Sequence, residues 1–514
     1  MEINGYKLDS EQENIVYDNS NYLLVVAGAG AGKTLTILGK IKYLLSTGIK
    51  SDGILCISFT NEACNSLREK LKMNGMDINV LTFHKLSLNI LKNKYQAADP
   101  NTLDNIIDNF FKIDVLYNEK MLDIVLKYFG LKNKNEYLKF YKTGYEYIVN
   151  VEKLISTFIK LFKCNNYKLE DFNSFLKKAR NIFNLKNYKR EKYLLILILN
   201  IYIEYMDYLD ENNEIDFDDM LIKATSEVQK NYFNNTKYII IDEYQDTSYI
   251  RFELIKAIIE KTNSKLMVVG DDFQSIYRFT GCDLDLFNNF SKYFKNSRVL
   301  KISSTYRNSN ELIKIAGKFI MKNRYQIQKN LKSFKHINKP IVVVRYKNKG
   351  DLKKLILKIY QKNKKILILG RNNNDINNYL DADFVIRDNK IIYLKNKNVD
   401  ISYLTVHKSK GLECDNVIII NLYNKTLGFP NKMVDDKILR FVSKSRIKYL
   451  YDEERRLFYV ALTRTKEKVY LFTPLNSSVF VNELIDDFRK DIEIVNINNL
   501  DKWYLTKLEY KCII

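Results

Sequence analysis

Short runs of apolar residues alternate along the chain with stretches whose apolar positions repeat at helical spacing. Five runs precede residue 270, at 22–26, 54–59, 80–83, 238–241 and 266–269. Five more follow residue 340, at 341–344, 366–369, 403–406, 417–420 and 469–472. Near-continuous apolar strands separated by helices are typical of parallel sheets covered on both faces. The pattern therefore predicts two α/β domains.

The first group of strands is interrupted between about residues 95 and 211 by a helical stretch rich in Lys, Tyr and Phe. This pattern favours an all-helical insertion in the first α/β domain. We therefore expect residues 1–94 and 212–292 to form the first domain, 95–211 the insertion, and 293–514 the second domain.

The charge balance points to a class of partner. The 514 residues include 83 Lys and Arg against 61 Asp and Glu, which gives a net charge of +22. A strongly basic chain favours a polyanionic partner, nucleic acid first. The alternative is a codon bias of an AT-rich genome, because Lys, Asn, Ile and Tyr are all abundant. Charge alone does not decide between them.

Several classes of protein are disfavoured. The longest apolar stretch, 193–203, is interrupted by Asn200 and is shorter than the roughly 18–20 residues that span a bilayer. The first residues lack the basic and apolar regions of a signal peptide. Six cysteines without a CxxC pair, and only three histidines, fit neither a disulfide framework nor a zinc site. We expect a cytoplasmic protein with no membrane partner.

A glycine-rich loop follows the first strand. Its sequence, AGAGAGKT, comprises Ala27, Gly28, Ala29, Gly30, Ala31, Gly32, Lys33 and Thr34. Small residues let backbone N–H groups surround a polyphosphate at a helix N-terminus. Lys33 would then reach the β- and γ-phosphates, and Thr34 would bind Mg²⁺. A dinucleotide fingerprint is excluded, because it needs a glycine at position 33.

A second acidic element supports an ATP site. The strand at 238–241 ends in Asp242 and Glu243. In this position Asp242 would hold Mg²⁺ through water, and Glu243 would orient or deprotonate the attacking water. A surface acidic pair after an ordinary strand is the alternative for this segment alone, but the upstream lysine loop favours the ATP site.

The residues around this strand resemble the UvrD/Rep-type superfamily 1A DNA helicases. The segment IIIDEYQDTS (239–248) looks like the second motif of that family. Eight further segments match in the family's order: LDSEQENIV (8–16), ISFTNEACNSL (57–67), LTFHKL (81–86), IDFDDML (215–221), VVGDDFQSIYRFTG (268–281), STYRNS (304–309), LTVHKSKGLE (404–413) and EERRLFYVALTRTK (453–466). The resemblance implies two RecA-like domains of the P-loop NTPase class, with parallel sheets and a helical 1B insertion in the first.

The resemblance also implies an ATP site in the cleft between these domains. Gln274 would sense the γ-phosphate, and Arg307 and Arg464 would stabilise the phosphoryl group in transfer. The adenine would be read by Gln12 and stacked on Tyr306. Two further residues fall in the nucleotide site by position, Leu35 (where many relatives carry an arginine) and Glu413.

The DNA contacts are likewise carried over by resemblance. Phe59, Phe279 and Tyr277 match positions at which the family stacks the bases of a single strand. Stacking is sequence-tolerant, because every base has a π-face. The strand or its phosphates would be touched by Thr60, His84, Arg371 and His407. Without the motifs, core packing would explain the aromatic residues and a buried imidazole the histidines.

One departure from UvrD and Rep concerns size. The 97 residues from 308 to 404 are needed for the second RecA-like domain itself, which leaves room for about one hairpin at 384–398. We therefore expect the regulatory 2B domain of UvrD and Rep to be absent or vestigial. In this respect the core is most like helicase IV.

By resemblance, the chain is an ATP-dependent DNA helicase that moves 3′→5′ on single-stranded DNA, with ATP and Mg²⁺ as cofactors. It would act at junctions of single- and double-stranded DNA in repair, recombination or phage defence, with a nuclease or another protein subunit as a possible partner. The alternative is a DNA-stimulated ATPase switch or sensor subunit of a larger complex, with little unwinding of its own.

Overall fold

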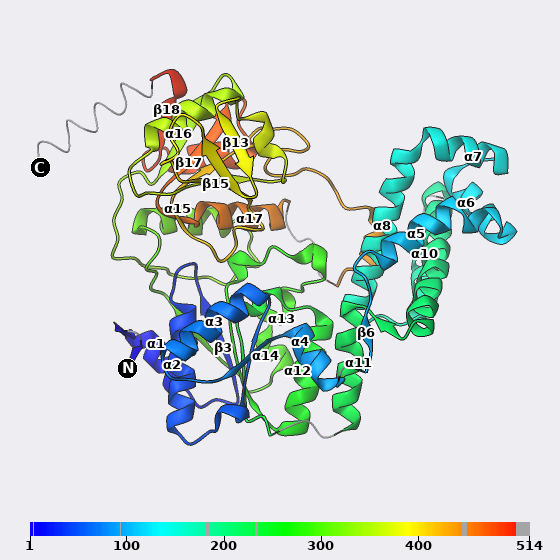
Figure 1. Cartoon of the computed structure of the whole chain (residues 1–514), viewed down its shortest axis with the longest axis horizontal. Helices are drawn as coiled ribbons and strands as arrows, with labels where there is room; N and C mark the ends of the chain where they lie inside the picture. Colours follow the sequence, from blue (N-terminus) through cyan, green and yellow to red (C-terminus); the bar gives the residue numbers. More distant parts are fainter. Residues whose placement is uncertain (4, 93, 181–184, 232–234, 445–449, 500–514) are drawn as a thin grey trace, which may run out of the picture.

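The computed structural model describes residues 1–3, 5–92, 94–180, 185–231, 235–444 and 450–499. Figure 1 shows two lobes, each built on a sheet, one above the other, with a helical domain to one side. The expected fold class, two parallel-sheet α/β domains with a helical insertion in the first, is confirmed. Residues 500–514 of the last expected segment lie outside the described residues. No helix within the described ranges is long and apolar enough to cross a membrane.

The first lobe is built on a six-stranded sheet whose paired strands are all parallel. Its strands in spatial order are β10 (Arg298–Ile302), β3 (Tyr22–Ala27), β9 (Lys265–Gly270), β8 (Tyr238–Ile241), β4 (Ile54–Ser58) and β5 (Asn79–Thr82). Alternate residues of β3 enter two different apolar clusters, Leu24 and Val26 in one and Leu23 and Val25 in the other. Both faces of the sheet are covered, which explains the near-continuous apolar strands.

Helices cover this sheet. They are α1 (Ser10–Tyr17), α2 (Lys33–Ser46), α3 (Asn61–Met73), α4 (Phe83–Ile90), α11 (Phe217–Lys230), α12 (Tyr249–Thr262), α13 (Asp285–Asn288) and α14 (Phe290–Tyr293). Two short strands, β1 (Glu2–Ile3) and β2 (Tyr6–Lys7), form an antiparallel pair near the N-terminus.

Strand β10 lies beyond residue 292, where we expected the first domain to end. It pairs in parallel with β3, from Arg298 opposite Leu23 to Ile302 opposite Ala27. The strand forms the edge of the sheet, and its outer residues are exposed. Only Ile302 of β10 is buried, so this strand lacks the continuous apolar pattern by which the central strands could be predicted.

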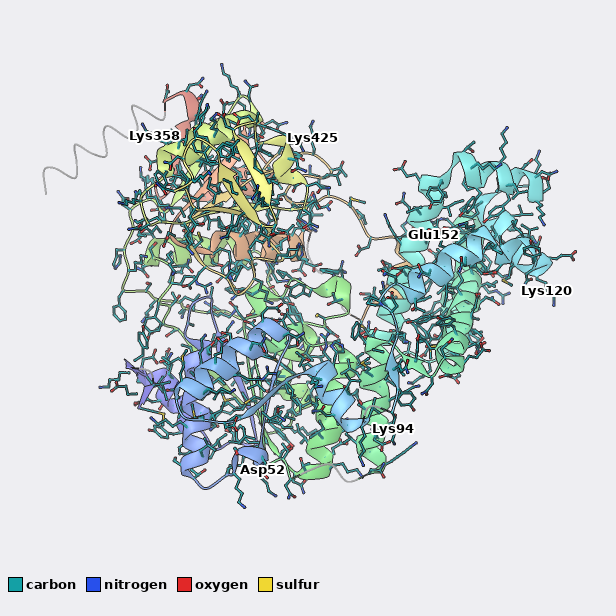
Figure 2. The ribbon with its side chains drawn as sticks, in the orientation of Figure 1. Asp52, Lys94, Lys120, Glu152, Lys358 and Lys425 are labelled. Atoms are coloured by element: carbon teal, nitrogen blue, oxygen red, sulfur yellow. The ribbon has the colours of Figure 1, made fainter. Side chains whose placement is uncertain are left out.

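The helical domain consists of six helices inserted between β5 and β8 with their connections. They are α5 (Thr102–Lys112), α6 (Glu119–Phe129), α7 (Lys134–Thr143), α8 (Tyr145–Cys164), α9 (Asp171–Arg180) and α10 (Leu185–Glu211). The chain enters and leaves the domain beside a short parallel pair, β6 (Gln96–Ala97) and β7 (Glu214–Ile215). Figure 2 shows Lys94 beside the first lobe, and Lys120 at the far side of the helical domain.

The second lobe is built on an eight-stranded sheet. Its strands in spatial order are β13 (Phe384–Arg387), β14 (Lys390–Tyr393), β15 (Ile401–Thr405), β12 (Ile366–Gly370), β16 (Cys414–Ile419), β17 (Thr465–Pro474), β11 (Ile341–Tyr346) and β18 (Glu493–Asn496). Its helices are α15 (Asn310–Ile320), α16 (Leu352–Ile359), α17 (Asp452–Leu462) and α18 (Val479–Phe488). In the described part of this sheet, the antiparallel pairings join β13 to β14 and β14 to β15, so a hairpin occupies the expected place at 384–398.

A segment of the second lobe completes the core of the helical domain. Residues 431–444, here called the bridging segment, leave the lobe between β16 and α17 and reach the helical domain (Figure 1). Ile438, Phe441 and Val442 are buried in the apolar cluster of that domain. Two ion pairs flank them: Arg190 with Asp436 at 3.0 Å, and Arg440 with Glu191 at 2.5 Å.

We predict that Phe441→Ala loosens the helical domain. The ring of Phe441 stacks on Phe175 of α9 with centroids 5.7 Å apart, so truncation opens a cavity in the cluster. Such a change costs about 3–5 kcal/mol in a well-packed core. Hydrogen exchange of α8, α9 and α10 should accelerate accordingly. The matched control is Val434→Ala in the same segment, where the side chain is 90% exposed. Unchanged exchange in α9 of Phe441→Ala would contradict this packing role.

Candidate functional site

The glycine-rich loop joins the end of β3 to the start of α2. Gly30 and Gly32 have positive φ values of 69° and 77°, a conformation that favours glycine. A Cβ on Gly30 would lie 2.5 Å from the Cβ of Arg307, and one on Gly32 would lie 2.7 Å from Nε2 of Gln12. The two glycines therefore let the chain segments around Arg307 and Gln12 approach the loop closely. Ala27 ends β3, and Leu35 packs against the apolar cluster beneath α2.

The acidic pair follows β8 at the same edge of the sheet as the loop. Nζ of Lys33 lies 3.3 Å from Oε1 of Glu243, whose backbone N–H donates to Oδ1 of Asp242 at 2.9 Å. Burial and the neighbouring Glu243 raise the pKa of Asp242. Burial also opposes ionisation of Glu243, but Lys33 and Lys410 outweigh it and lower the pKa of Glu243. Glu243 is therefore the more acidic carboxyl group of this pair.

The residues present fit a magnesium ion. Thr34 is the second residue of α2 and offers a hydroxyl, while Asp242 offers a carboxylate at the end of β8. Hard oxygen ligands of this kind, few in number, suit Mg²⁺, which keeps several waters. The buried carboxylate of Asp242 is also poorly compensated by the protein, since burial raises its pKa. A divalent cation would supply the missing positive charge.

The second lobe brings a buried guanidinium to this edge. Arg464 is 1% exposed, and its hydrogen-bond partners are neutral oxygens. It donates to the carbonyls of Val460 at 3.0 Å and Leu412 at 3.2 Å, and to Oε1 of Gln274 at 2.9 Å. Burial and the nearby Arg307 lower the pKa of Arg464 to about 9. A buried cation without a paired carboxylate is a site prepared for an anion.

Residues 305–307 lie against the glycine-rich loop. Oγ1 of Thr305 donates to the carbonyl of Ala29 at 2.7 Å, and the backbone N–H of Tyr306 donates to the carbonyl of Gly30 at 3.0 Å. Arg307 pairs through Nε with Glu413 at 2.9 Å. Arg307 and Glu413 are therefore brought together beside the loop.

The two expected adenine contacts lie at the same end of the loop. Gln12 is buried and donates through Nε2 to the carbonyl of Ala31 at 3.4 Å, while its backbone N–H donates to Oδ1 of Asp9, the residue that caps α1. The hydroxyl of Tyr306 donates to Oδ2 of Asp9 at 3.0 Å, and its ring is exposed. Both side chains thus meet near Asp9 and Gly32, where a base could be read on one edge and stacked on one face.

Three of the expected DNA contacts gather where the lobes meet. The hydroxyl of Tyr277 donates to the carbonyl of His407 at 3.1 Å, and the ring of Phe279 meets the imidazole of His407 edge-on at 5.8 Å. Phe279 is 59% exposed, which leaves a ring face for a base. Arg371 lies on the same lobe as His407 and pairs with Glu454 at 2.9 Å.

The other expected DNA contacts lie on the first lobe. The ring of Phe59 packs edge-on against Phe83 at 5.4 Å, and Thr60 caps α3 by accepting from the N–H of Ala63 at 3.1 Å. The imidazole of His84 lies 4.9 Å from the exposed ring of Phe217. Phe59 and His84 thus present aromatic surface on one side of the sheet edge, whereas the hydroxyl oxygen of Thr60 accepts a hydrogen bond from the first turn of α3.

Sequence reasoning missed three neighbours of these groups. The guanidinium of Arg251 lies 5.1 Å from the ring centre of Phe59, and Lys410 joins the carboxylate of Asp246 and the carbonyl of Gln274 across the lobes. The third is Phe217. Lys410 and Phe217 fall within segments that resemble the family, a signal that could have found them. Arg251 stands on a helix with no pattern to distinguish it.

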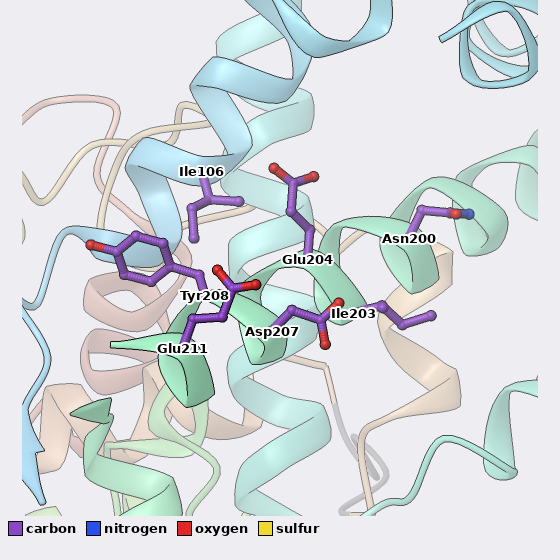
Figure 3. Close-up of a pocket in the computed structure, with 7 residues that line it drawn as sticks. All are labelled: Ile106, Asn200, Ile203, Glu204, Asp207, Tyr208 and Glu211. Atoms are coloured by element: carbon purple, nitrogen blue, oxygen red, sulfur yellow. The ribbon is translucent and has the colours of Figure 1, made fainter. Parts of the chain in front are cut away.

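A pocket elsewhere in the molecule is unrelated to this site. Figure 3 shows it between α5 and α10 of the helical domain, with Glu204, Asp207 and Glu211 among its lining residues. The acidic lining does not suit a polyphosphate, and none of the expected site residues contributes to it.

Two parallel-sheet lobes, one with a phosphate loop and the other with arginines at the same edge, define a two-lobed P-loop NTPase of RecA-like architecture. Comparison with known proteins places it further. Residues 8–295, more than half of the chain, match the family model of the UvrD/REP helicase N-terminal domain. Residues 387–475 match the UvrD-like helicase C-terminal domain. The chain belongs to the UvrD/Rep helicase family.

Curated relatives agree with this assignment. DNA helicase IV of Escherichia coli is 28% identical over 504 residues, which cover 94% of this chain and 71% of that protein. A probable DNA helicase of Mycoplasma pneumoniae is 26% identical over 494 residues, 90% of this chain and 83% of its own length. The ATP-dependent DNA helicase Rep of Buchnera aphidicola (from Acyrthosiphon pisum) is 29% identical over 366 residues, 68% of this chain. The chain matches about half, 51%, of that Rep protein.

We predict that His84 and His407 stay neutral above about pH 5. Burial, aided by Arg251 for His84 and by Arg371 for His407, lowers the pKa of each imidazole from 6.5 to about 4. Nuclear magnetic resonance titration of the imidazole protons checks this, with His84→Ala and His407→Ala to assign the signals. A midpoint near 6.5 for either residue would contradict the burial.

The same shift sets a pH dependence of stability. Between pH 4 and 6.5 the unfolded chain binds protons at these positions and the folded chain does not. The free energy of unfolding should therefore fall as the pH is lowered through this window, and the two alanine variants should lose part of that dependence. Neutral imidazoles would contact DNA by stacking or hydrogen bonding rather than by neutralising phosphate.

Proposed function

We propose that the chain is an ATP-driven motor that moves along single-stranded DNA and separates duplex strands. The observation that carries this proposal is the contact between Arg464 of the second lobe and Gln274 of the first, at 2.9 Å. Gln274 lies in the segment that ends in Tyr277 and Phe279, where the expected DNA contacts gather. One short segment thus adjoins both the phosphate loop and the DNA-binding aromatic residues.

In this proposal ATP binds with its phosphates on the loop at 27–34. Lys33 would leave Glu243 for the phosphates, which frees the carboxylate to orient the attacking water. Thr34 and Asp242 would hold Mg²⁺, which supplies charge stabilisation to the phosphates. Arg307 and Arg464 would meet the γ-phosphate, so that ATP draws the two lobes together. Gln12 and Tyr306 would receive the adenine.

The positive charge of Arg464 and Arg307 favours a cycle in which a triphosphate binds, is hydrolysed and is released. Arg464 is buried with neutral partners, and Arg307 has Glu413 as its partner. Arrival of a triphosphate would offset the buried positive charge, and its hydrolysis and loss would restore the unfavourable state. Each cycle would therefore close and release the lobes. DNA held by Phe279 and His407 across the lobes would be displaced with them. As a motor on DNA, the protein would work in the cytoplasm at junctions of single- and double-stranded DNA.

A second candidate is a DNA-stimulated ATPase switch with little unwinding. One observation favours it. A single hairpin, β13–β14, stands where the resemblance to UvrD and Rep would place a whole regulatory domain. A partner subunit, for example a nuclease, would then supply strand separation or cleavage.

We predict that Lys33→Ala and Glu243→Gln abolish ATP hydrolysis stimulated by single-stranded DNA. Loss of the base and of the phosphate contact should each lower kcat by at least about 100-fold, the usual scale for a positioned general base. Glu243→Gln should keep nucleotide binding, whereas Lys33→Ala should weaken it. The control is Lys42→Ala, an exposed lysine on the same helix α2. A wild-type ATPase indifferent to DNA would refute the motor.

We predict that the protein unwinds duplexes with a 3′ single-stranded tail and leaves 5′-tailed and blunt duplexes intact. The 3′→5′ direction is the one that the family resemblance implies, and a motor that moves in this direction reaches the junction from a 3′ tail. Strand separation on labelled substrates measures it, with displacement of streptavidin from biotinylated single strands as a parallel test of translocation. Translocation without unwinding would favour the switch, while unwinding from the 5′ tail would contradict the polarity.

A further inference from the structure

The connection between α15 and β11 crosses back over the first lobe. Within it, Leu331 packs beside Gly28, where a Cβ would meet its side chain at 2.7 Å. Lys329 lies two residues earlier, with its side chain 3% exposed. Its Nζ is 2.5 Å from Oδ1 of Asp271 and also contacts Oδ1 of Asp272. This lysine therefore reaches two buried carboxylates of the first lobe from a loop of the second lobe.

Asp271 and Asp272 need this lysine. Both side chains are 0% exposed, and a buried carboxylate is costly unless a cation or hydrogen-bond donors lie beside it. Nζ of Lys329 also lies 3.5 Å from the ring centre of Phe273, which adds a cation–π contact. The second oxygen of Asp272 accepts from Nε2 of Gln326 and from the N–H of Ile327, both at 2.7 Å.

The second carboxylate oxygen of Asp271 is linked to Arg464 through the side-chain amide of Gln274. It accepts from Nε2 of Gln274 at 2.6 Å, and Oε1 of the same amide accepts from Arg464 at 2.9 Å. An ionised Asp271 accepts hydrogen bonds only, so it must face the NH₂ end of the Gln274 amide. The oxygen end is thereby left toward Arg464. If Asp271 were displaced, this constraint would be lost and the amide could turn.

We propose that Lys329 is a positioning residue for ATP hydrolysis. Its ion pair holds Asp271 in place, Asp271 fixes the orientation of the Gln274 amide, and the amide holds the guanidinium of Arg464 at the nucleotide site. Because Lys329 belongs to the loop between α15 and β11 of the second lobe, the same contact ties the geometry around Gln274 to the position of that loop. This inference rests on the function proposed above.

The test compares two variants in ATP hydrolysis stimulated by single-stranded DNA. Asp272→Asn alone keeps the Lys329–Asp271 pair and should leave kcat within about twofold of the wild type. Adding Lys329→Met to Asp272→Asn removes the pair. The double variant has lost one negative and one positive charge, so the net charge of the cluster equals that of the wild type. The double variant should lose at least tenfold in kcat, with KM for ATP changed by less than about threefold. Thermal unfolding and circular dichroism of both variants check that they fold.

Asp271→Asn alters the other partner of the Lys329–Asp271 ion pair and leaves Lys329 paired with Asp272. The neutral amide no longer dictates the orientation of Gln274, so kcat should again fall at least tenfold. This variant keeps the inference testable if the double variant does not fold. Wild-type kcat in folded Asp271→Asn or in the folded double variant would overturn the positioning role.

A double-mutant cycle separates positioning from a general structural effect. In a Gln274→Ala background, Lys329→Met with Asp272→Asn should lower kcat by less than about twofold further, because the contact acts through the missing amide. Losses that multiply would overturn the inference. Hydrolysis that survives Lys33→Ala would instead overturn the proposed function, so the two failures are distinguishable.

Discussion

The buried guanidinium of Arg464 is the constraint on which the arrangement of the two lobes depends. A cation that is 1% exposed and surrounded by neutral oxygens is costly unless an anion reaches it. Burial lowers its pKa to about 9, which still leaves it charged near neutral pH. The second lobe therefore places an uncompensated positive charge against the first lobe, which carries the glycine-rich loop. An anion held by that loop would compensate this charge. ATP would complete a site that neither lobe forms alone.

The segment 271–281 is the point where all three parts of the molecule meet. Gln274 receives Arg464 of the second lobe, and the backbone carbonyl of Ser275 accepts from Nε of Arg456 at 2.6 Å. At its other end, Gly281 packs against Cys164 of the helical domain. Asp271 and Gln274 are buried in this segment, whereas Phe279 is exposed. One stretch of backbone therefore joins Gln274, which contacts Arg464, to the aromatic residues at which we expect DNA to bind.

The central elements could be predicted from sequence because their cause is local. All ten apolar runs became strands, and AGAGAGKT formed a loop between β3 and α2. What could not be predicted depends on distant partners. The exposed edge strand β10 has little apolar pattern, and the bridging segment is recognisable only beside the cluster that buries Phe441. Lys329 is one lysine among many in a basic chain until Asp271 and Asp272 are seen around it.

The helical domain is held from two directions, and this restricts how the lobes can move. Toward the first lobe, the buried Lys163 of α8 pairs with Asp216 at 2.5 Å and with Asp219 at 2.7 Å, both at the start of α11. On the second, the bridging segment places Phe441 and Val442 in the helical core. Both attachments are buried, so neither yields easily. A movement of the second lobe relative to the first would have to be absorbed where the bridging segment joins the second lobe, and in its described part Met433 and Val434 are exposed. That stretch would carry the closing motion while the helical domain stays with the first lobe.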